Sequence, residues 1–338
     1  MTEHSEPLLS ICIPTYSRAS LLEEGLKAIL SQLEGPLSGS VDVIVSDNAS
    51  PDETMSVVAR LKDQYPLVRL RYHRQVENIG GDANVAGCPH LAKGRFVWIV
   101  SDDDIVLPGA VQRIVGVLKG DPSADAVILN YWGFRESMDR STPTIFPTGK
   151  DMPMMGSNTV LTFIGTYVTF ISCMAFRRDL LGSSDHSRRI DGMAPACTFI
   201  DVLRDVRSAC FVAEPTIAIR THNQNASYSF YAIFVTKFAG MMRYALSRGF
   251  SPDAVRAVLR KHLRRYLFGF TLTFRLDRDF GNLKEPNYFD AARRLAAVYW
   301  GDVFFWTVML PILLLPRFMW AAPMGFLRGL MQRRKTAG

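Results

Sequence analysis

The chain has 338 residues, of which 48% are apolar and 21% are charged, so it is long and apolar enough for one large α/β domain plus an appendage. The net charge of +7 is uneven, because residues 228–338 hold 18 Lys or Arg and 6 Asp or Glu, a balance of +12. Residues 1–227 carry a balance of −5. A mildly acidic first part argues against a nucleic-acid partner, since phosphate contacts need clustered Lys and Arg.

Apolar runs of strand length recur through the first 220 residues and alternate with helix-length segments. Strands are predicted at Leu8–Pro14, Val41–Ser46, Val68–Tyr72, Phe96–Val100, Ala126–Tyr131, Tyr167–Phe176 and Ala209–Ile219. Amphipathic helices are predicted at Arg18–Gln32, Asp52–Gln64 and Gly109–Leu118. Runs rich in Val and Ile between helices indicate βαβ units, and therefore an α/β fold with a mostly parallel sheet flanked by helices.

The character of the sequence changes after Tyr228, where long helical stretches begin at Phe230–Leu246 and Pro252–Phe270. We therefore predict a nucleotide-binding and catalytic domain over 1–227 and a helical, basic, apolar region over 228–338. The five cysteines are widely spaced and form no CxxC pair, which is typical of a reducing cytosol without a zinc site. Met1–Pro7 is polar, so no secretory signal is expected.

Polar residues follow three of the predicted strands directly, as Pro14–Arg18, Asp47–Ser50 and Ser101–Asp104. In an open parallel sheet, ligands bind beyond the carboxyl ends of the strands. Three such groups at one edge therefore predict a binding site there.

Asp102, Asp103 and Asp104 are the most informative of these residues. Three consecutive carboxylates repel one another unless a cation compensates, and oxygen ligands favour Mg²⁺ or Mn²⁺. Such an ion, when bound, neutralises a diphosphate leaving group. The alternative is a solvated acidic turn that caps the helix starting near Pro108.

The same segments carry a family resemblance, in order and spacing, over roughly residues 8–220. Five stretches carry it, namely Ile13–Arg18, Val45–Ser50, Asn78–Gly81 with Asn84, Lys93–Phe96, and Ser101–Asp104. Together they resemble the family 2 glycosyltransferases of the GT-A fold, and among these the bacterial O-antigen enzymes of the abequosyl- and rhamnosyltransferase type. Typical members read Asp-x-Asp-Asp where this chain has Ser101 first.

The resemblance implies a nucleotide-sugar donor and assigns roles to individual residues. Donor-nucleotide contacts fall to Pro14, Thr15, Tyr16, Arg18, Asp47, Gly80, Gly81 and Asp102, and metal contacts to Asp103, Asp104 and His222. Within this set, Asp47 would accept a hydrogen bond from the base, and Asp102 would face the ribose. The alternatives are a helix N-cap for Asp47, an ordinary turn for Gly80 and Gly81, and a surface histidine for His222.

An inverting transfer also needs a carboxylate that removes the proton of the acceptor hydroxyl. Many relatives supply it from a Glu-Asp pair in the second half, and this sequence has no such pair between 170 and 220. The candidates are Asp191, Asp201 and Asp185, in that order. Asp201 has an alternative as the solvated face of a predicted helix, Thr198–Val206.

The stretch between Arg294 and Arg317 has 22 residues and one charge, Asp302. Its length just reaches that of a spanning helix, but its Gly and Pro residues favour helices that lie in a membrane interface. A basic cluster follows at Arg328, Arg333, Arg334 and Lys335, and a basic helix face is predicted from Arg256, Arg260, Lys261, Arg264 and Arg265. The alternatives are a buried core or dimer helix for the apolar stretch, and a solvated face for the basic helix.

These observations predict an inverting, metal-dependent glycosyltransferase that transfers a sugar to a lipid-linked saccharide acceptor. It would lie in the cytoplasm, bound peripherally to the anionic inner face of the membrane. The alternatives are a metal-dependent nucleotidyltransferase, for which only Arg18 offers triphosphate contact near the first strand, and a catalytically silent membrane-bound scaffold.

Overall fold

The computed structural model describes residues 6–134, 138, 144–147, 149–182, 192–221, 229–276, 286–316, 318 and 319. The chain divides into two compact units, one made of residues 1–222 and 244–254 and the other of residues 223–243 and 255–338. The division at 227/228 expected from the sequence stays a prediction.

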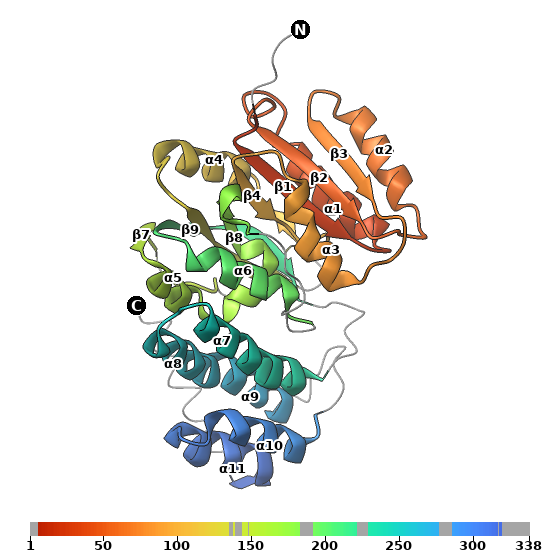
Figure 1. Ribbon diagram of the computed structural model, residues 1–338. Helices are drawn as coiled ribbons and strands as arrows, with labels where there is room; N and C mark the ends of the chain where they lie inside the picture. The colour runs from red at the N-terminus through yellow and green to blue at the C-terminus, as the bar shows by residue number, and fades with distance from the viewer. Residues whose placement is uncertain are drawn as a thin grey trace. The chain divides into compact units, whose positions relative to one another are not determined.

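The first unit is built on a nine-stranded sheet in the order β3-β2-β1-β4-β8-β6-β9-β5, with β7 paired to β9 (Figure 1). Its strands are β1 (Leu9–Thr15), β2 (Val41–Asp47), β3 (Arg69–Arg74), β4 (Phe96–Ile99), β5 (Ile105–Val106), β6 (Ala126–Phe134), β7 (Met152–Met155), β8 (Met174–Arg177) and β9 (Ser208–Arg220). The pairs β1–β2, β1–β4, β2–β3 and β6–β9 are parallel, whereas β8, β5 and β7 run antiparallel to their partners. The predicted α/β class is confirmed, and the sheet is mixed.

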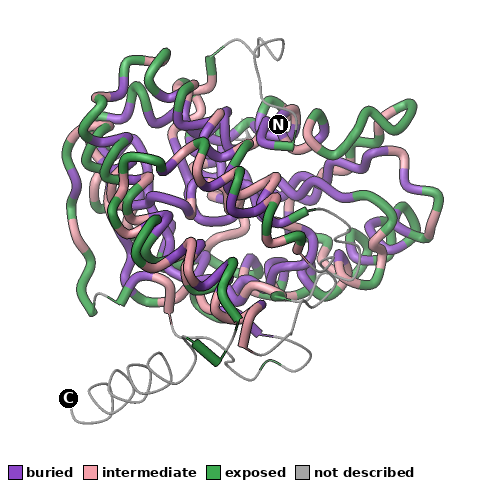
Figure 2. The backbone as a smooth tube through the Cα atoms, turned by 90° about the horizontal axis from the view of Figure 1, so that it is seen from below, coloured by how far each residue is buried: buried purple, intermediate pink, exposed green. Residues whose placement is uncertain are grey.

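The central strands are buried on both faces, which explains their unbroken apolar sequences. Every residue of β1 and β2 is buried, and Trp98 of β4 is fully buried. The helices of this unit are α1 (Ala19–Leu30), α2 (Thr54–Gln64), α3 (Gly81–Gly87), α4 (Ala110–Gly120), α5 (Ser157–Ile164) and α6 (Ala194–Arg204). In Figure 2 the buried positions lie mostly inside the fold and the exposed ones on its outer turns, as expected when helices cover a parallel sheet.

The strand predicted over Tyr167–Phe176 is only partly correct. The chain forms 3₁₀ turns at Gly165–Thr169 and Ile171–Cys173, and the strand β8 begins at Met174. The apolar run correctly indicates that these residues are buried, but burial alone does not distinguish a strand from a packed turn. These turns place Ser172 beside β4, because the indole nitrogen of Trp98 donates to the Ser172 carbonyl at 2.9 Å.

The second part of the chain is helical. Its helices are α7 (Phe238–Ser247), α8 (Pro252–Lys261), α9 (Phe268–Leu276), α10 (Tyr288–Tyr299) and α11 (Leu310–Leu314), with π-helical turns at Ala232–Lys237, His262–Leu267 and Phe305–Met309. Within the second unit, the stretch after Arg294 is amphipathic. Leu295, Tyr299, Phe305 and Met309 are buried in one core cluster, which bears out the core alternative for one side of this stretch.

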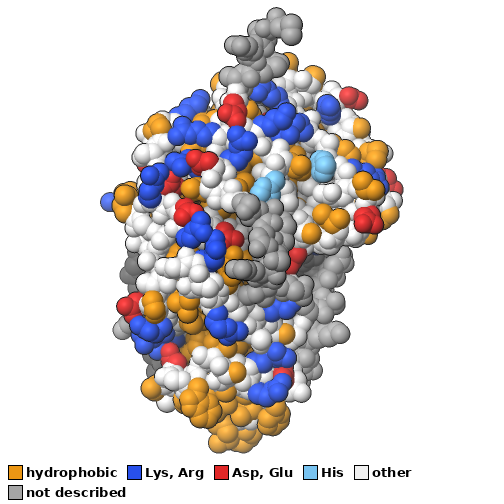
Figure 3. Space-filling model, viewed as in Figure 1, with side chains coloured by type: hydrophobic (Ala, Val, Ile, Leu, Met, Phe, Trp, Pro, Cys, Tyr) orange, Lys and Arg blue, Asp and Glu red, His pale blue; other side chains and the backbone are white. Residues whose placement is uncertain are grey.

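The other side of the stretch is exposed. Trp300 and Val303 are 67% and 72% exposed, and the flanking residues Phe289 and Phe318 are 77% and 81% exposed. Figure 3 shows hydrophobic side chains gathered at the end of the second unit formed by α10 and α11. In the part of the chain that the structure describes, no helix has the length and hydropathy needed to cross a bilayer. The basic cluster at 328–335 lies outside the described residues.

Candidate active site

The carboxyl ends of β1, β2 and β4 meet at one edge of the sheet because these three strands are parallel neighbours. The register pairs Thr15 with Asp47 across β1 and β2. The Thr15 hydroxyl donates to Oδ2 of Asp102, which follows β4, at 2.7 Å. The structure therefore brings together three residues that the sequence analysis assigned to the donor.

Asp102 and Asp103 share one cation, the guanidinium of Arg18. Nη1 of Arg18 lies 3.0 Å from Oδ1 of Asp102 and 3.3 Å from Oδ2 of Asp103. The other oxygen of each carboxylate accepts a hydrogen bond from a hydroxyl group. The Thr15 hydroxyl donates to Oδ2 of Asp102, and the Ser101 hydroxyl donates to Oδ1 of Asp103 at 2.6 Å. Two carboxylate oxygens therefore converge on a single cationic nitrogen.

Asp104 faces a different set of partners. Its Oδ2 accepts a hydrogen bond from the Ser172 hydroxyl at 2.7 Å, and it also accepts from the backbone N–H of Arg220. The Ser172 hydroxyl in turn accepts from the backbone N–H of Ser101. Sequence reasoning missed Ser172 and Arg220, because no local pattern marks residues that meet the aspartate loop from about 70 and 116 positions away. Asp104 thus anchors the loop to the body of the domain.

The packing of α1 against this loop depends on Gly25. A Cβ at Gly25 would lie 3.1 Å from the carbonyl oxygen of Asp104 and 3.6 Å from that of Asp102. The missing side chain lets the helix approach the backbone of the acidic loop closely, which holds Arg18, just before α1, beside the carboxylates.

Burial shifts the titration of two of these carboxyl groups. Burial raises the pKa of Asp102 to about 6, with Arg18 opposing the shift and Asp103 adding to it. Burial, together with the charge of Asp103, raises the pKa of Asp104 well above its usual range. Both shifts reflect the cost of holding adjacent negative charges in a poorly solvated place, which is the condition under which a bound cation stabilises them most.

Asp47 is fully buried, and both of its carboxylate oxygens already accept hydrogen bonds. The Tyr72 hydroxyl donates to Oδ2, and the backbone N–H of Ser50 donates to Oδ1 at 2.9 Å. Asp47 therefore shapes the turn after β2. Its predicted contact with the base stays a prediction.

The loops after β2 and β3 are joined by side-chain amides. Nδ2 of Asn48 donates to Oδ1 of Asn78 at 2.9 Å, and Oδ1 of Asn48 accepts from the backbone N–H of Ile79. This brings Gly80 and Gly81, both exposed, to the end of β2. Gly80 has φ 86° and ψ 151°, a conformation that is essentially restricted to glycine.

The turns after β1 and β2 carry backbone strain. Ser17 and Ala49 have φ values of 53° and 61°, and both are non-glycine residues. Left-handed conformations at such residues cost about 1–2 kcal/mol each and concentrate at binding sites. Tyr16, which precedes Ser17, is 43% exposed, and its ring is available to a ligand at this edge, whereas Pro14 is buried.

Of the candidates for the catalytic base, the structure describes Asp201. Both oxygens of Asp201, on α6, accept from the Tyr244 hydroxyl at 2.8 Å, and Nε of Arg248 lies 2.7 Å from Oδ1. Asp201 is therefore committed to a structural contact. Asp191, Asp185 and His222 lie outside the described residues.

The residue after Asp191 is held against α3. The backbone N–H of Gly192 donates to Oδ2 of Asp82 at 2.6 Å, and that of Ala194 lies 3.5 Å from the same oxygen. Because α3 starts at Gly81, this contact ties the chain beside Asp191 to the helix that follows the predicted donor loop.

Among the described residues, no three His, Cys, Asp or Glu side chains form a set that could hold a metal ion by themselves. Mg²⁺ is, however, usually bound through one or two carboxylates, with phosphate oxygens and water filling the other positions. The converging oxygens of Asp102 and Asp103 meet that requirement, and Asp104, buried and bound to Ser172, meets it less well. The residues present therefore fit a divalent ion that arrives with a diphosphate.

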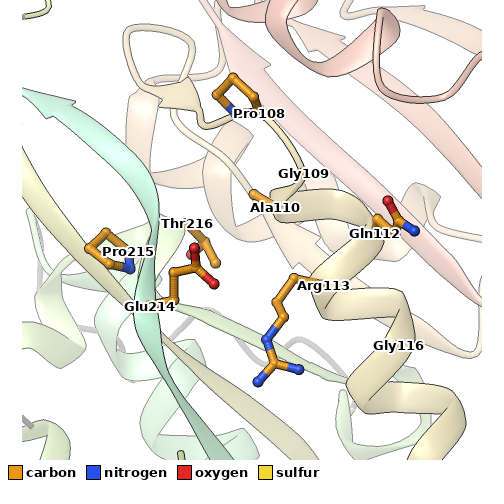
Figure 4. A pocket seen from close by; sticks show the side chains of 9 residues that line it. All are labelled: Pro108, Gly109, Ala110, Gln112, Arg113, Gly116, Glu214, Pro215 and Thr216. Atoms are coloured by element: carbon orange, nitrogen blue, oxygen red, sulfur yellow. The ribbon is translucent and has the colours of Figure 1, made fainter. Parts of the chain in front are cut away.

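A hollow of about 470 Å³ opens between the start of α4 and β9 (Figure 4). Arg113 of α4 and Glu214 of β9 reach into it from opposite sides, and Arg113 forms an ion pair with Asp151. None of the aspartates described above is among its lining residues, so we do not assign the donor to it.

Comparison with known proteins places this arrangement in a family. Residues 10–183 match the family described as Glycosyl transferase family 2, and these 174 residues are slightly more than half of the 338. The chain belongs to glycosyl transferase family 2. The match contains the Thr15, Asp47 and Asp102–Asp104 segments, so the resemblance inferred from the sequence is confirmed.

Two curated relatives match this family 2 glycosyltransferase over part of their length. Abequosyltransferase RfbV of Salmonella typhimurium is 37% identical over 99 residues, which cover 29% of this chain and 28% of that protein. The GalNAc(5)-diNAcBac-PP-undecaprenol beta-1,3-glucosyltransferase of Campylobacter jejuni is 33% identical over 109 residues, which cover 32% and 34%. The matched stretches thus span about a third or less of each relative.

Solved structures match over most of the chain. TarS 1–349 of S. aureus, in complex with UDP-GlcNAc, has a TM-score of 0.62 at 16% identity, covering 86% of this chain and 81% of that one. The mannosyltransferase PcManGT of Pyrobaculum calidifontis, in complex with GDP-Man and Mn²⁺, has a TM-score of 0.52 at 20% identity, covering 88% and 76%. At these identities the likeness shows a shared fold.

Proposed function

We propose that this family 2 glycosyltransferase transfers a sugar from a nucleotide-sugar donor to a lipid-linked saccharide acceptor. The observation that carries the proposal is the convergence of Asp102 Oδ1 and Asp103 Oδ2 at the carboxyl end of β4, beside Thr15. The nucleotide sugars bound by TarS and PcManGT support the donor class, and the undecaprenol-linked name of the Campylobacter relative supports the acceptor class.

A divalent ion, when bound, would stabilise the negative charge of the departing nucleoside diphosphate. We infer that Asp102 and Asp103 would hold it, because their Oδ1 and Oδ2 atoms converge on one position, whereas the sequence favoured Asp103 and Asp104. Gly80 and Gly81 would admit the donor close to the backbone, and Tyr16 would offer its exposed ring to the base.

The acceptor hydroxyl must lose a proton as the anomeric bond breaks. We propose Asp191 as the base of an inverting transfer, since Asp201 is already bound by Tyr244 and Arg248. Gly192, the sequence neighbour of Asp191, donates a backbone hydrogen bond to Asp82 of α3, the helix that follows the predicted donor loop.

Calorimetric titration tests this function against its alternatives. UDP, CDP, GDP and dTDP are titrated with and without Mn²⁺, and the corresponding triphosphates are assayed for cleavage. We expect one diphosphate to bind at least about tenfold more tightly with Mn²⁺, a difference of about 1.4 kcal/mol, with no triphosphate cleavage. Cleavage of a triphosphate would instead support a nucleotidyltransferase. The absence of any nucleotide binding would support a scaffold.

The exposed side chains of the second unit support a membrane partner. We propose that Phe289, Trp300 and Val303 enter the interface of an anionic bilayer, because aromatic side chains favour that depth. Arg256 and Arg260, which are exposed on α8, add attraction of about 1 kcal/mol each near anionic headgroups. Together with the cytoplasmic location expected from the sequence, this proposal gives peripheral binding at the cytoplasmic face.

The membrane proposal is tested by single substitutions, because truncation after Asp290 would delete the buried core that contains Leu295 and Phe305. We expect Trp300→Glu to lower co-sedimentation with phosphatidylglycerol vesicles about tenfold, since a charge must then be placed among the headgroups. The matched control is Leu67→Glu, at a 73% exposed position of the first unit. Equal losses in the two variants, or no loss in either, would retire the proposal.

A further inference from the structure

Arg18 occupies the place where a cation would bind. Its Nη1 lies within 3.3 Å of both Asp102 Oδ1 and Asp103 Oδ2, and its side chain is 24% exposed. The other oxygens of the two carboxylates are held by the Thr15 and Ser101 hydroxyl groups. The two oxygens of this pair that accept no hydroxyl hydrogen bond are thus the two that contact the guanidinium.

In the absence of ligands, this arrangement reduces the electrostatic repulsion between the Asp102 and Asp103 carboxylates. Two buried carboxylates with converging oxygens repel each other, and a positive group between them relieves the repulsion. Arg18 provides that group from the residue before α1. A divalent ion cannot share the position, because it would meet a positive charge at contact distance.

We propose that Arg18 is an internal counter-ion that the divalent cation displaces, and that the released guanidinium then binds the diphosphate of the donor. The inference rests on the proposed function for its second half. A planar guanidinium pairs with phosphate oxygens in a bidentate manner, so the donor offers Arg18 a replacement for the carboxylates. Metal and nucleotide then bind cooperatively. The metal releases Arg18 to bind the diphosphate, and the diphosphate lowers the free-energy cost of displacing Arg18 from the carboxylates.

The exchange has a direct consequence for binding of the metal alone. Without nucleotide, the ion must displace Arg18 and leave it without its two carboxylate partners, so affinity is low. With nucleotide, the guanidinium moves to the diphosphate and the ion enters at lower cost. Substitution of Arg18 by glutamine removes the positive charge that competes with the ion, and therefore raises the affinity for the metal alone. It also weakens the coupling between metal binding and diphosphate binding.

Isothermal titration calorimetry measures both effects without any assay of turnover. Mn²⁺ is titrated into wild type, Arg18→Gln and Arg60→Gln, first alone and then with the diphosphate selected in the nucleotide screen. Arg60→Gln is the matched control, because it also removes one positive charge from an ion pair. That pair joins Arg60 of α2 to Glu23 of α1. We expect Arg18→Gln to bind Mn²⁺ alone about tenfold more tightly, and Arg60→Gln to match wild type.

We further expect the ratio of Mn²⁺ affinities with and without diphosphate to fall about tenfold in Arg18→Gln. A destabilised loop would weaken metal binding, so a gain in affinity separates displacement of Arg18 from simple damage. Unchanged or weaker Mn²⁺ binding by Arg18→Gln would overturn the proposal. If no diphosphate binds wild type, the proposed function fails, and the titration with Mn²⁺ alone still decides the role of Arg18.

Discussion

Asp103→Asn is expected to reduce sugar transfer about a thousandfold while the protein stays folded. The substitution keeps the size of the side chain, and the Ser101 hydroxyl can still donate to the amide oxygen. It removes one of the two negative charges that converge on the cation position. The loss corresponds to about 4 kcal/mol of transition-state stabilisation, within the several kcal/mol that a bound metal supplies.

The thermal midpoint of Asp103→Asn should remain within a few degrees of wild type. The substitution costs a contact with Arg18 but relieves repulsion by Asp102 and Asp104, so the two effects oppose each other. Turnover is measured at saturating donor and Mn²⁺, and folding is followed by circular dichroism. Asp63→Asn, at an exposed position of α2, is the control and should retain full activity. More than a tenth of wild-type turnover in Asp103→Asn would contradict the assignment.

Gly94→Ala is expected to cause the largest loss of stability among single-methyl additions in the first unit. A Cβ at Gly94 would lie 2.7 Å from the backbone nitrogen of Ser10 and 2.8 Å from the carbonyl carbon of Leu9. Both atoms belong to the start of β1, which is paired with β2 on one side and β4 on the other, so the strand cannot yield.

The added methyl group would also break a buried contact. The backbone N–H of Gly94 donates to the Ser10 hydroxyl at 2.8 Å, and that hydroxyl donates to Asp42. Overpacking of this kind costs about 3 kcal/mol, equivalent to a fall of about 10 °C in Tm for a domain of this size.

The control for this prediction is Gly116→Ala. Nothing lies within 4 Å of a Cβ at Gly116, on α4, so alanine should stabilise the helix by about 0.5–1 kcal/mol. Thermal melts of the two variants should therefore shift in opposite directions. A Gly94→Ala protein that melts within about one degree of wild type would show that β1 tolerates the displacement.

Two parts of the sequence resemblance have a physical explanation in the structure. The Lys93–Phe96 segment carries its glycine because the chain passes against the backbone of β1 before it enters β4. The acidic loop begins with Ser101 instead of Asp, and here the hydroxyl of Ser101 fixes Oδ1 of Asp103. The departure from the usual motif therefore leaves the converging pair of carboxylates in place.

Local sequence signals predicted the first strands, their helices and the edge of the sheet at which the candidate site lies. β1, β2, β3 and β4 and helices α1, α2 and α4 were predicted within a few residues, because apolar period and turn residues are local signals. The position of Asp102 at the end of a buried strand follows from the same local pattern.

Contacts between distant segments, in contrast, set which carboxylates contact Arg18 and which one anchors the loop. Asp104 is bound by Ser172 and by the backbone of Arg220, and Asp201 by Tyr244 and Arg248, and none of these partners is marked in the local sequence. The antiparallel direction of β8 was likewise not readable. Periodicity reports whether a residue is buried, whereas the identity of its neighbours depends on how distant segments pack.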